Sequence, residues 1–571
     1  MVGSQAGSLS IHGGSPFADA TREVLLPHTK KAVEETPFDA LKVDPDKLIE
    51  RIGNFGWFQM LNIFLVVAPL YIYSGVMMLI PLLTEDPESF ECMLLPGFNQ
   101  SYEVLDRCTV MDMSTGKNET CLSLLGTATS FDYNGTDTSA SLTTDYDLVC
   151  ESESARDHIS SVFLFGTMAG SVIVAAFSDK AGRKTAALSG LYIGAAASML
   201  TALAPNYLIF LILRFLGGFG IGGLYSVVIL PEILTQSMRD WMPIPGTIFW
   251  VAGYFAAGGA RAAFTSWRWA YVAISAPLLL TLSFPWFYPE SLHWLIANEK
   301  KEEAERYVER AVRYSGKDID LKDCCIDEDP EAPEDEESKE TKSSGGGFLP
   351  YLTIVSNGCI LFHFVNACYL MAVMSATYWV LSLGASEQSE NKITGLFLSG
   401  LVELPAAFIA VVFMKLMKRR PVSALMMFMT AFFMIVPVFL PASFHGSYFA
   451  MSFPLLAKTA NSICWNVLPL AMSEMIPTPI RNSYAGGSGF IAEIGSIFAP
   501  YLGHMKWHEH ASTILIATFT GIGGFLILTM PETKGAPLIR DVASFDEGPF
   551  LRRICRKNKR IAVNDKKNQA V

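Results

Sequence analysis

The chain has 571 residues, of which 51% are hydrophobic and only 17% are charged. A water-soluble protein of this length needs more charge to cover its surface, so the composition argues against an ordinary soluble enzyme or binding domain. The formal net charge of −12 gathers in loops such as 327–340, where acidic residues are solvated, and it points to no particular partner.

Residues 1–57 are polar and contain several prolines, so we expect a cytosolic N-terminal segment that is not a cleavable signal peptide. Six apolar runs follow, then a polar stretch, then six more runs. Each run is about 20 residues long and almost free of charge, as a membrane-spanning helix requires. The predicted spans are 58–82, 158–177, 186–203, 207–229, 244–263, 270–288, 353–382, 393–414, 422–441, 447–471, 484–503 and 512–530.

The long loop 83–157, between the first two predicted spans, carries two signs of an extracellular location. It contains three N-x-S/T sequons, at Asn99, Asn118 and Asn134. It also contains four cysteines, namely Cys92, Cys108, Cys121 and Cys150. We therefore expect a glycosylated, disulfide-bonded extracellular loop. Four cysteines allow three pairings, and the sequence does not choose among them.

The positive charges predict the orientation. They collect at 180–184, at 415–420 and in the tail 552–567, and such segments lie on the cytosolic side. The sequons and cysteines of loop 83–157 are a second, independent signal, and they agree with the positive charges. Because the number of spans is even, both termini are then expected in the cytosol of a plasma-membrane protein. The expected layout is a first bundle over 58–288, a cytosolic segment over 289–352, a second bundle over 353–530 and a cytosolic tail over 531–571.

Two charged motifs recur at a fixed distance. Glu232 precedes Arg239 at the end of the fourth span, and Glu474 precedes Arg481 at the end of the tenth. Pro-Glu pairs follow the sixth span at 289–290 and the twelfth at 531–532. Each second copy lies 242 residues after its first, which indicates two homologous six-span bundles. Transporters built from such repeats bind substrate between the halves.

A third charged motif lies between the second and third spans, in residues 178–184. Asp179 and Arg183 flank a glycine turn there, and the related stretch 415–420 keeps the basic residues but lacks the Asp and Gly. Together the motifs predict a cytosolic latch of charge pairs that holds one access state. The alternative is that they are charged helix ends that set topology alone. The motifs resemble those of the major facilitator superfamily.

Further motifs resemble the organic ion transporter family, solute carrier family 22, over about residues 45–540. They are Gly53-Asn-Phe-Gly-Trp-Phe-Gln59, Leu148-Val-Cys150, Trp267-Arg-Trp269, Pro289-Glu-Ser-Leu-His-Trp-Leu295, Leu401-Val-Glu-Leu-Pro-Ala406 and Pro531-Glu-Thr-Lys-Gly535. The resemblance implies an all-α membrane protein with the major facilitator fold, twelve transmembrane helices in two six-helix bundles. It also implies secondary transport of organic cations, anions or zwitterions by alternating access.

Ionisable residues inside the spans are candidates for function because burying them in a membrane is costly. Glu493 lies in the eleventh span, where cation-transporting members of the resembled family have Asp and anion-transporting members have Arg. A carboxylate there is a counter-charge for an ammonium group, so we predict an organic cation or zwitterion as substrate. The alternative is that Glu493 pairs with Lys458 of the tenth span and is structural. Glu403 is interpreted as a structural or gating carboxylate, and Arg214 is expected to bond within the first half.

Aromatic rings supply the second part of a cation site, because a ring face attracts an ammonium ion. Tyr378 and Trp379 match a paired aromatic position of the cation carriers, and Trp250 and Trp465 are candidates to complete a cage. The alternative for each is ordinary helix packing.

Two other functions stay open. One is an organic anion carrier that uses Lys458 and Arg214 as its counter-charge, and the other is a non-transporting receptor or scaffold on the transporter fold. An enzyme is not expected, and no Walker loop supports ATP-driven transport. We expect no cofactor, no metal and no nucleic-acid partner. The predicted partners are a small organic ion and the lipid bilayer, and no oligomeric state is predicted.

Overall fold

The structure, a computed structural model, describes residues 45–53, 56–84, 90–96, 98, 101–133, 140–226, 230–235, 238, 241–298, 300–315, 349–385, 389, 391–441, 448–503, 510–535, 539, 545–546 and 548–550. The chain divides into two compact units. The small unit comprises 1–60 and 292–333, and the large unit comprises 61–291 and 334–571.

The described residues of the small unit form the helices α3 (Pro45–Ile52), α15 (Leu292–Ala297) and α16 (Lys301–Ser315). Helix α3 buries Leu48, Ile49 and Ile52, whose spacing places them on one helix face. They share a core with apolar residues of α15 and α16, in which the rings of Phe58 and Tyr307 meet edge to face at 5.4 Å. Helices α15 and α16 follow the first bundle within the segment 289–352, for which the sequence predicted no helix.

The large unit begins with the first bundle. Its helices are α4 (Trp57–Val67), α5 (Leu70–Leu83), α7 (Ala155–Ala181), α8 (Arg183–Thr201), α9 (Tyr207–Ser226), α10 (Leu230–Ile233), α12 (Pro243–Ala263), α13 (Trp267–Ser275), the 3₁₀ helix η3 (Ala276–Ser283) and α14 (Phe284–Phe287). The described residues of each predicted span of the first half are mainly helical, and residues 227–229 of the fourth span lie outside the described residues. The first span is divided at 68–69, since Pro69 has no N–H with which to continue the helix. The sixth span runs through α13, η3 and α14.

The second bundle repeats this arrangement. Its elements are α18 (Leu349–Ser356), α19 (Gly358–Leu383), α20 (Lys392–Leu401), α21 (Glu403–Leu416), α22 (Arg419–Ile435), the 3₁₀ helix η5 (Val436–Phe439), α23 (Tyr448–Glu474), α24 (Thr478–Gly503) and α25 (Ala511–Ile527). The predicted seventh span joined the end of α18 to α19. These are separate helices, because the Asn357 side chain caps α19 by accepting from two of its first N–H groups. The eighth span is divided at Val402. Pro405 has no N–H group, so it cannot donate the helical hydrogen bond to the carbonyl of Leu401, four residues earlier.

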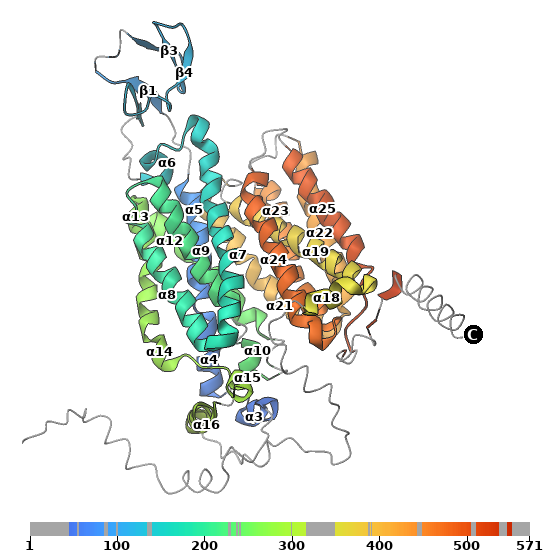
Figure 1. The fold of residues 1–571 in the computed structure, drawn as a ribbon. Coiled ribbons are helices and arrows are strands. Elements are labelled where there is room, and N and C mark those ends of the chain that lie inside the picture. The colour runs from blue at the N-terminus through green and yellow to red at the C-terminus, as the bar shows by residue number, and fades with distance from the viewer. Residues whose placement is uncertain are drawn as a thin grey trace, which may run out of the picture. The chain divides into compact units, whose positions relative to one another are not determined.

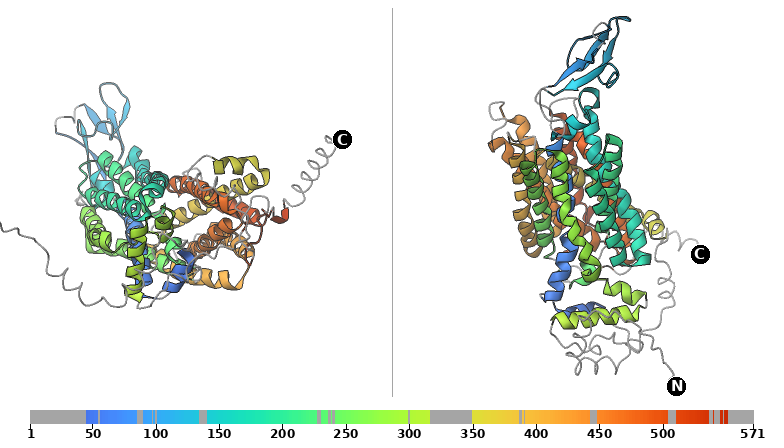
Figure 2. Two further views of the ribbon diagram at one scale, coloured as in Figure 1. Left: turned by 60° about the horizontal axis from the view of Figure 1, so that its bottom comes forward. Right: turned by 90° about the vertical axis from the view of Figure 1, so that its left-hand side faces the viewer.

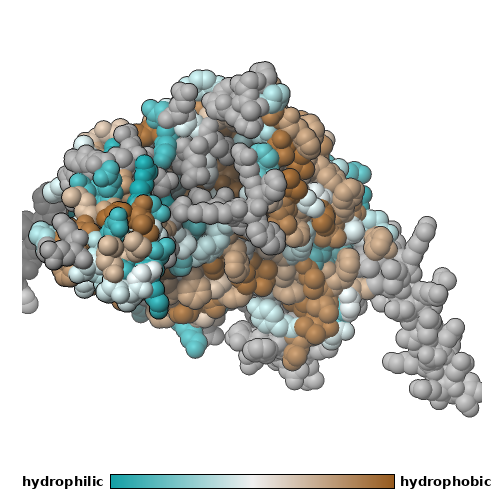
Figure 3. Space-filling model, turned by 90° about the horizontal axis from the view of Figure 1, so that it is seen from above, coloured by the Kyte–Doolittle hydropathy of each residue, from teal (hydrophilic) through white to brown (hydrophobic). Residues whose placement is uncertain are grey.

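The two bundles stand side by side in the large unit (Figures 1 and 2). Six described segments are apolar and long enough to cross a membrane, namely Ala155–Ala181, Tyr207–Leu224, Trp267–Phe287, Gly358–Leu383, Lys392–Leu416 and Arg419–Phe439. Large apolar side chains such as Leu280, Phe432 and Phe525 are exposed on the outside of the bundles. Figure 3 shows hydrophobic residues gathered around the side of the molecule. An apolar outer surface of this extent suits a hydrocarbon environment.

Within the first bundle, α9 packs tightly between α7 and α8. A Cβ added at Gly218 would overlap the carbonyl oxygen of Phe163 on α7, and one at Gly220 would overlap the backbone of Gly194 on α8. The glycine-rich run 217–223 therefore lets three helix backbones approach one another closely.

The loop between α5 and α7 forms two small antiparallel sheets. Strand β1 (Glu91–Leu94) pairs with β5 (Thr129–Asp132), and β3 (Thr109–Asp112) lies between β2 (Tyr102–Val104) and β4 (Asn118–Thr120). Of the three possible cysteine pairings, the structure has Cys92 with Cys121 and Cys108 with Cys150. Asn118 is exposed, whereas Asn99 and Asn134 lie outside the described residues.

The loop returns to the bundle through α6 (Leu142–Asp145) and the 3₁₀ helix η2 (Cys150–Ser154). Asp145 accepts hydrogen bonds from the Trp267 indole at 2.9 Å and from the Arg268 guanidinium at 2.8 Å. These bonds tie α6 to the start of α13. We call the end of the bundles that carries this loop the loop end.

Candidate functional site

Two helices of the first bundle, α7 and α12, make most of the contacts with the second bundle. Helix α7 packs against α24, and α12 packs against α20 and α21. The Ser161 hydroxyl of α7 donates to the Ile497 carbonyl of α24 at 2.9 Å. The rings of Phe255 on α12 and Phe397 on α20 are 5.1 Å apart. Ser161, Phe255 and Ile497 lie in the halves of their helices nearer the loop end, and Phe397 lies in that half of the span Lys392–Leu416. The bundles are therefore closed against each other there.

Helix α24 presents a different environment toward its other end. A Cβ at Gly486 or Gly489 would meet no atom within 4 Å, so this part of the helix faces open space. Glu493 follows Gly486 by two helical turns and therefore lies on the same face. Its Oε2 atom is buried and has no hydrogen-bond partner among the described residues. An intramembrane carboxylate thus stands where the open face of α24 meets the closed interface.

Lys458 of α23 bonds to Glu403 rather than to Glu493. The Lys458 Nζ lies 2.8 Å from Glu403 Oε1, and both side chains are almost wholly buried. Lys458 also donates to the Ser399 hydroxyl at 2.6 Å and to the Tyr254 hydroxyl of α12 at 2.9 Å. The alternative in which Glu493 pairs with Lys458 is therefore absent from this structure. Ser399 and Tyr254 were not among the residues predicted from the sequence.

The predicted aromatic residues meet beside this ion pair. Tyr378 of α19 donates to Glu403 at 2.9 Å and accepts from the Trp250 indole of α12 at 2.7 Å. The Trp379 ring lies 6.3 Å from that of Tyr73 and 6.4 Å from that of Trp250. The structure thus gathers Tyr378, Trp379 and Trp250 where the two bundles meet.

Trp465 lies elsewhere on α23 and packs against the cores of both bundles. Its indole N–H has no hydrogen-bond partner among the described residues. Within the described part of the chain, its ring makes no contact with those of Trp250, Tyr378 or Trp379. A buried indole N–H without a partner is unusual, because such donors normally find an acceptor.

Arg214 of α9 is buried inside the first bundle. Its guanidinium donates to the Val76 carbonyl at 3.3 Å and to the Tyr271 hydroxyl at 3.2 Å. It also lies over the Phe163 ring, 4.2 Å from the centroid. Every one of these contacts comes from the first bundle, so Arg214 does not reach the interface with the second.

The repeated charged motifs assemble into one cluster in each bundle, at the end away from the loop. In the first bundle Arg183 pairs with Asp179 at 2.6 Å and with Glu232 at 3.5 Å. Glu290 accepts from the Lys184 backbone N–H at the start of α8, at 3.0 Å. Burial raises the pKa of Glu290 above its ordinary value, although these backbone amides act in the opposite direction.

The second bundle has the corresponding contacts. Arg419 forms an ion pair with Glu474, and its backbone N–H donates to Glu532 at 2.9 Å. Glu232 of α10 thus bonds to the arginine that begins α8, and Glu474 of α23 bonds to the arginine that begins α22. Arg481 instead donates to the Ile476 carbonyl at 3.1 Å. Arg239 lies outside the described residues.

The cluster of the second bundle provides a testable prediction. Glu474→Gln is expected to reduce uptake about fivefold, because a partly exposed ion pair contributes about 1 kcal/mol. The exchanged pair Arg419→Glu with Glu474→Arg is expected to recover most of the loss, measured as initial uptake per transporter at the cell surface. Glu309→Gln, at an exposed position of α16, is the matched control for loss of a carboxylate. If uptake by the exchanged pair were no higher than uptake by Glu474→Gln, the proposed latch would be contradicted.

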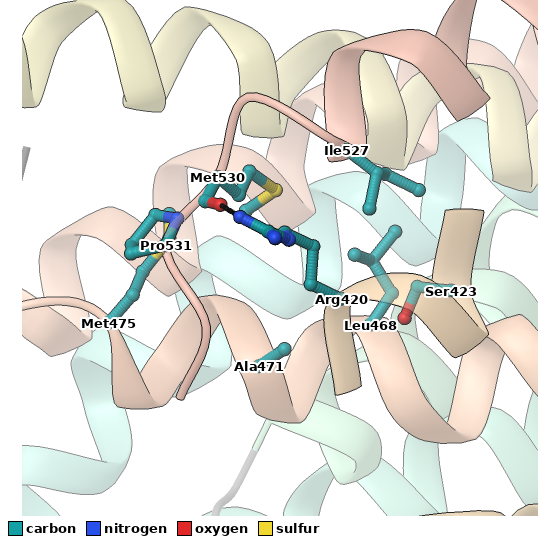
Figure 4. Close-up of a pocket in the computed structure, with 8 residues that line it drawn as sticks. All are labelled: Arg420, Ser423, Leu468, Ala471, Met475, Ile527, Met530 and Pro531. Atoms are coloured by element: carbon teal, nitrogen blue, oxygen red, sulfur yellow. Dashed lines mark hydrogen bonds between the residues drawn. The ribbon is translucent and has the colours of Figure 1, made fainter. Parts of the chain in front are cut away.

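A small cavity lies among α22, α23 and the end of α25 (Figure 4). The Arg420 guanidinium donates to the Met530 carbonyl at its edge, at 3.3 Å, and Leu468 and Ile527 line its apolar side. Its volume of about 10 Å³ holds about one water molecule. An organic ion does not fit there, so this cavity is not a substrate site.

The chain was compared with known proteins. It is 25% identical over 541 residues to an organic cation transporter protein of Drosophila melanogaster, covering 88% of this chain and 95% of that one. It is 26% identical over 516 residues to organic anion transporter 3 of Sus scrofa (86% and 92% covered), and 27% identical over 436 residues to solute carrier family 22 member 2 of Mus musculus (75% and 75%). These relatives confirm the resemblance to solute carrier family 22.

Among solved structures, an inward-open conformation of the xylose transporter XylE from E. coli superposes with a TM-score of 0.53 at 14% identity, covering 83% of this chain and 97% of that one. This likeness confirms the major facilitator fold. The matches are transporters rather than enzymes, and the chain is a multi-pass membrane protein. A family model described as "Sugar (and other) transporter" matches residues 98–541. The chain therefore belongs to this family of sugar and other transporters.

Proposed function

We propose that this transporter carries small organic cations or zwitterions by alternating access, with Glu493 as the counter-charge for the substrate ammonium. The observation that carries the proposal is the unpartnered Oε2 of Glu493 beside the open face of α24. A buried carboxylate oxygen without a partner is unfavourable. A substrate cation supplies the missing partner, and the free energy of that contact favours binding.

The intramembrane cations support the same assignment. An anion carrier needs a cation free to meet its substrate. Lys458 is already bonded to Glu403, Ser399 and Tyr254, and Arg214 is enclosed within the first bundle. Nε of Arg214 also lacks a hydrogen-bond partner among the described residues, but it lies inside the first bundle. Glu493 is thus the charged candidate whose unused bonding atom lies beside the open face of α24. The relatives are named for both organic cations and organic anions, so their names do not decide the charge.

The closed interface at the loop end and the open face of α24 fit a carrier whose site is reached from the end away from the loop. We assign the loop, with its disulfides and sequons, to the extracellular side of the plasma membrane, and both termini to the cytosol. In that orientation this is the inward-facing state. Aromatic residues Trp250, Tyr378 and Trp379 then line the route between the bundles, together with Trp465.

Uptake by cells that express the chain tests the proposal. The probes are labelled tetraethylammonium, carnitine and benzoate, each compared with mock-transfected cells. A monovalent cation gains about 2.3 kcal/mol per 100 mV, which corresponds to roughly 50-fold accumulation. Tetraethylammonium uptake is therefore expected to fall when high external potassium collapses the membrane potential.

The other outcomes decide against the proposal. Uptake of benzoate alone, abolished by Lys458→Ala, would establish the anion carrier. If uptake of the three probes, and of a wider panel of organic ions, did not exceed uptake by mock-transfected cells, a non-transporting receptor or scaffold would be favoured.

A further inference from the structure

The Lys458 side chain occupies a complete ammonium site. An ammonium group has three N–H donors, and three oxygens lie within bonding distance of Nζ. These are Ser399 Oγ at 2.6 Å, Glu403 Oε1 at 2.8 Å and the Tyr254 hydroxyl at 2.9 Å. Lys458 is only 1% exposed, so the protein satisfies the group without water.

Two aromatic rings complete the enclosure. Nζ lies 4.5 Å from the centroid of the Tyr254 ring and 5.4 Å from that of Tyr378. A carboxylate with two ring faces is the usual composition of a protein site for an ammonium ion. We call these four residues, Tyr254, Tyr378, Ser399 and Glu403, the ammonium cage.

The backbone is arranged to build this cage. Ser399 lies near the end of α20 and Glu403 begins α21, on either side of the break at Val402. Tyr378 donates to the same oxygen of Glu403, Oε1, that Lys458 contacts, and it accepts from Trp250, so the carboxylate is oriented by a second hydrogen bond. The chain therefore maintains an organised cation site and fills it with its own lysine.

We propose that the ammonium cage is a binding site for primary alkylammonium groups whose resident ligand is the tethered Lys458. The resident ammonium neutralises Glu403 and excludes substrate cations from it. Tyr254 belongs to the first bundle and the other cage residues to the second. The occupied cage thus also links the bundles, and Lys458 loses only the Tyr254 contact when they separate.

The test removes the Lys458 ammonium group by mutation and supplies a free primary alkylammonium ion from solution. Lys458→Ala is purified in detergent, and its melting temperature is measured against n-propylammonium, which has the three carbons and the ammonium group that the substitution deletes beyond Cβ. A saturable rise of several degrees is expected. No such rise is expected for the wild type, whose cage is filled, or for Glu403→Gln/Lys458→Ala, which lacks the carboxylate. Tetramethylammonium has no N–H to donate and is expected to have a much smaller effect.

If Lys458→Ala is too unstable to purify, the readout is the yield of monodisperse protein from cells grown with and without n-propylammonium, and a higher yield with this ion is expected. The absence of rescue in both measurements, or equal rescue in the double variant, would overturn the proposal. Neither measurement involves transport or Glu493. A positive result would therefore stand even if the chain carried anions, and a negative one would leave the role of Glu493 untouched.

Discussion

Glu493→Gln is expected to reduce uptake of tetraethylammonium at least 30-fold. Glutamine has nearly the same shape as glutamate but no charge, so the variant removes the counter-charge and little else. Truncating one partner of a buried charge pair costs about 2–5 kcal/mol of binding, and 2 kcal/mol corresponds to roughly 30-fold. The measurement is the initial rate of uptake, divided by the amount of transporter at the cell surface.

Stability separates this effect from misfolding. The Glu493 Oε2 is buried without a partner, so its replacement by an amide is expected to leave the melting temperature unchanged or to raise it. Glu493→Asp retains the charge and is expected to retain measurable uptake. Glu309→Gln, at an exposed position of α16, is the matched control for loss of a carboxylate. Equal uptake by the wild type and Glu493→Gln would remove Glu493 from the substrate site.

The Lys458–Glu403 pair is expected to show strong coupling in a double-mutant cycle. Lys458→Met or Glu403→Gln alone leaves one buried charge without its partner, which costs about 3–5 kcal/mol of stability. The double variant leaves neither charge, so it is expected to be more stable than either single variant. Thermal unfolding of the purified proteins, followed by size-exclusion chromatography, measures this order.

The contrary outcome of this cycle is also specific. If the two single effects simply added, the 2.8 Å contact between Lys458 and Glu403 would contribute no interaction energy. Ser423→Ala together with Thr430→Ala is a suitable control pair, because both hydroxyls are buried on α22 and bond to carbonyls of their own helix. Their effects are expected to be additive.

The apolar runs of the sequence predicted the spans well. Each span has to place about 20 apolar residues in the hydrocarbon layer and to satisfy its backbone hydrogen bonds within the helix. Both requirements are local, so they can be seen without knowing what a helix packs against. Two of the interruptions within predicted spans again have a local cause. Pro69 lacks the N–H group that a continuous helix needs, and the Asn357 side chain caps the start of α19.

The repeated charged motifs were visible in sequence, but their partners were not. Glu232 lies seven residues before Arg239, yet the structure joins it to Arg183, which belongs to a different motif. The corresponding bond of the second bundle joins Glu474 to Arg419. Which helix end lies beside which is decided by bundle packing, and a spacing along one chain segment carries no information about it.

By itself, the sequence determined that this protein crosses a membrane many times, that its two halves are related, and which charged residues lie inside the spans. Only the tertiary structure decided that Lys458 bonds to Glu403, leaving an oxygen of Glu493 without a partner. It also chose one cysteine pairing of three and added Tyr254 and Ser399 to the site. The physical reason is that hydropathy acts residue by residue, whereas a charge pair depends on the separation of two atoms whose helices are brought together only by packing.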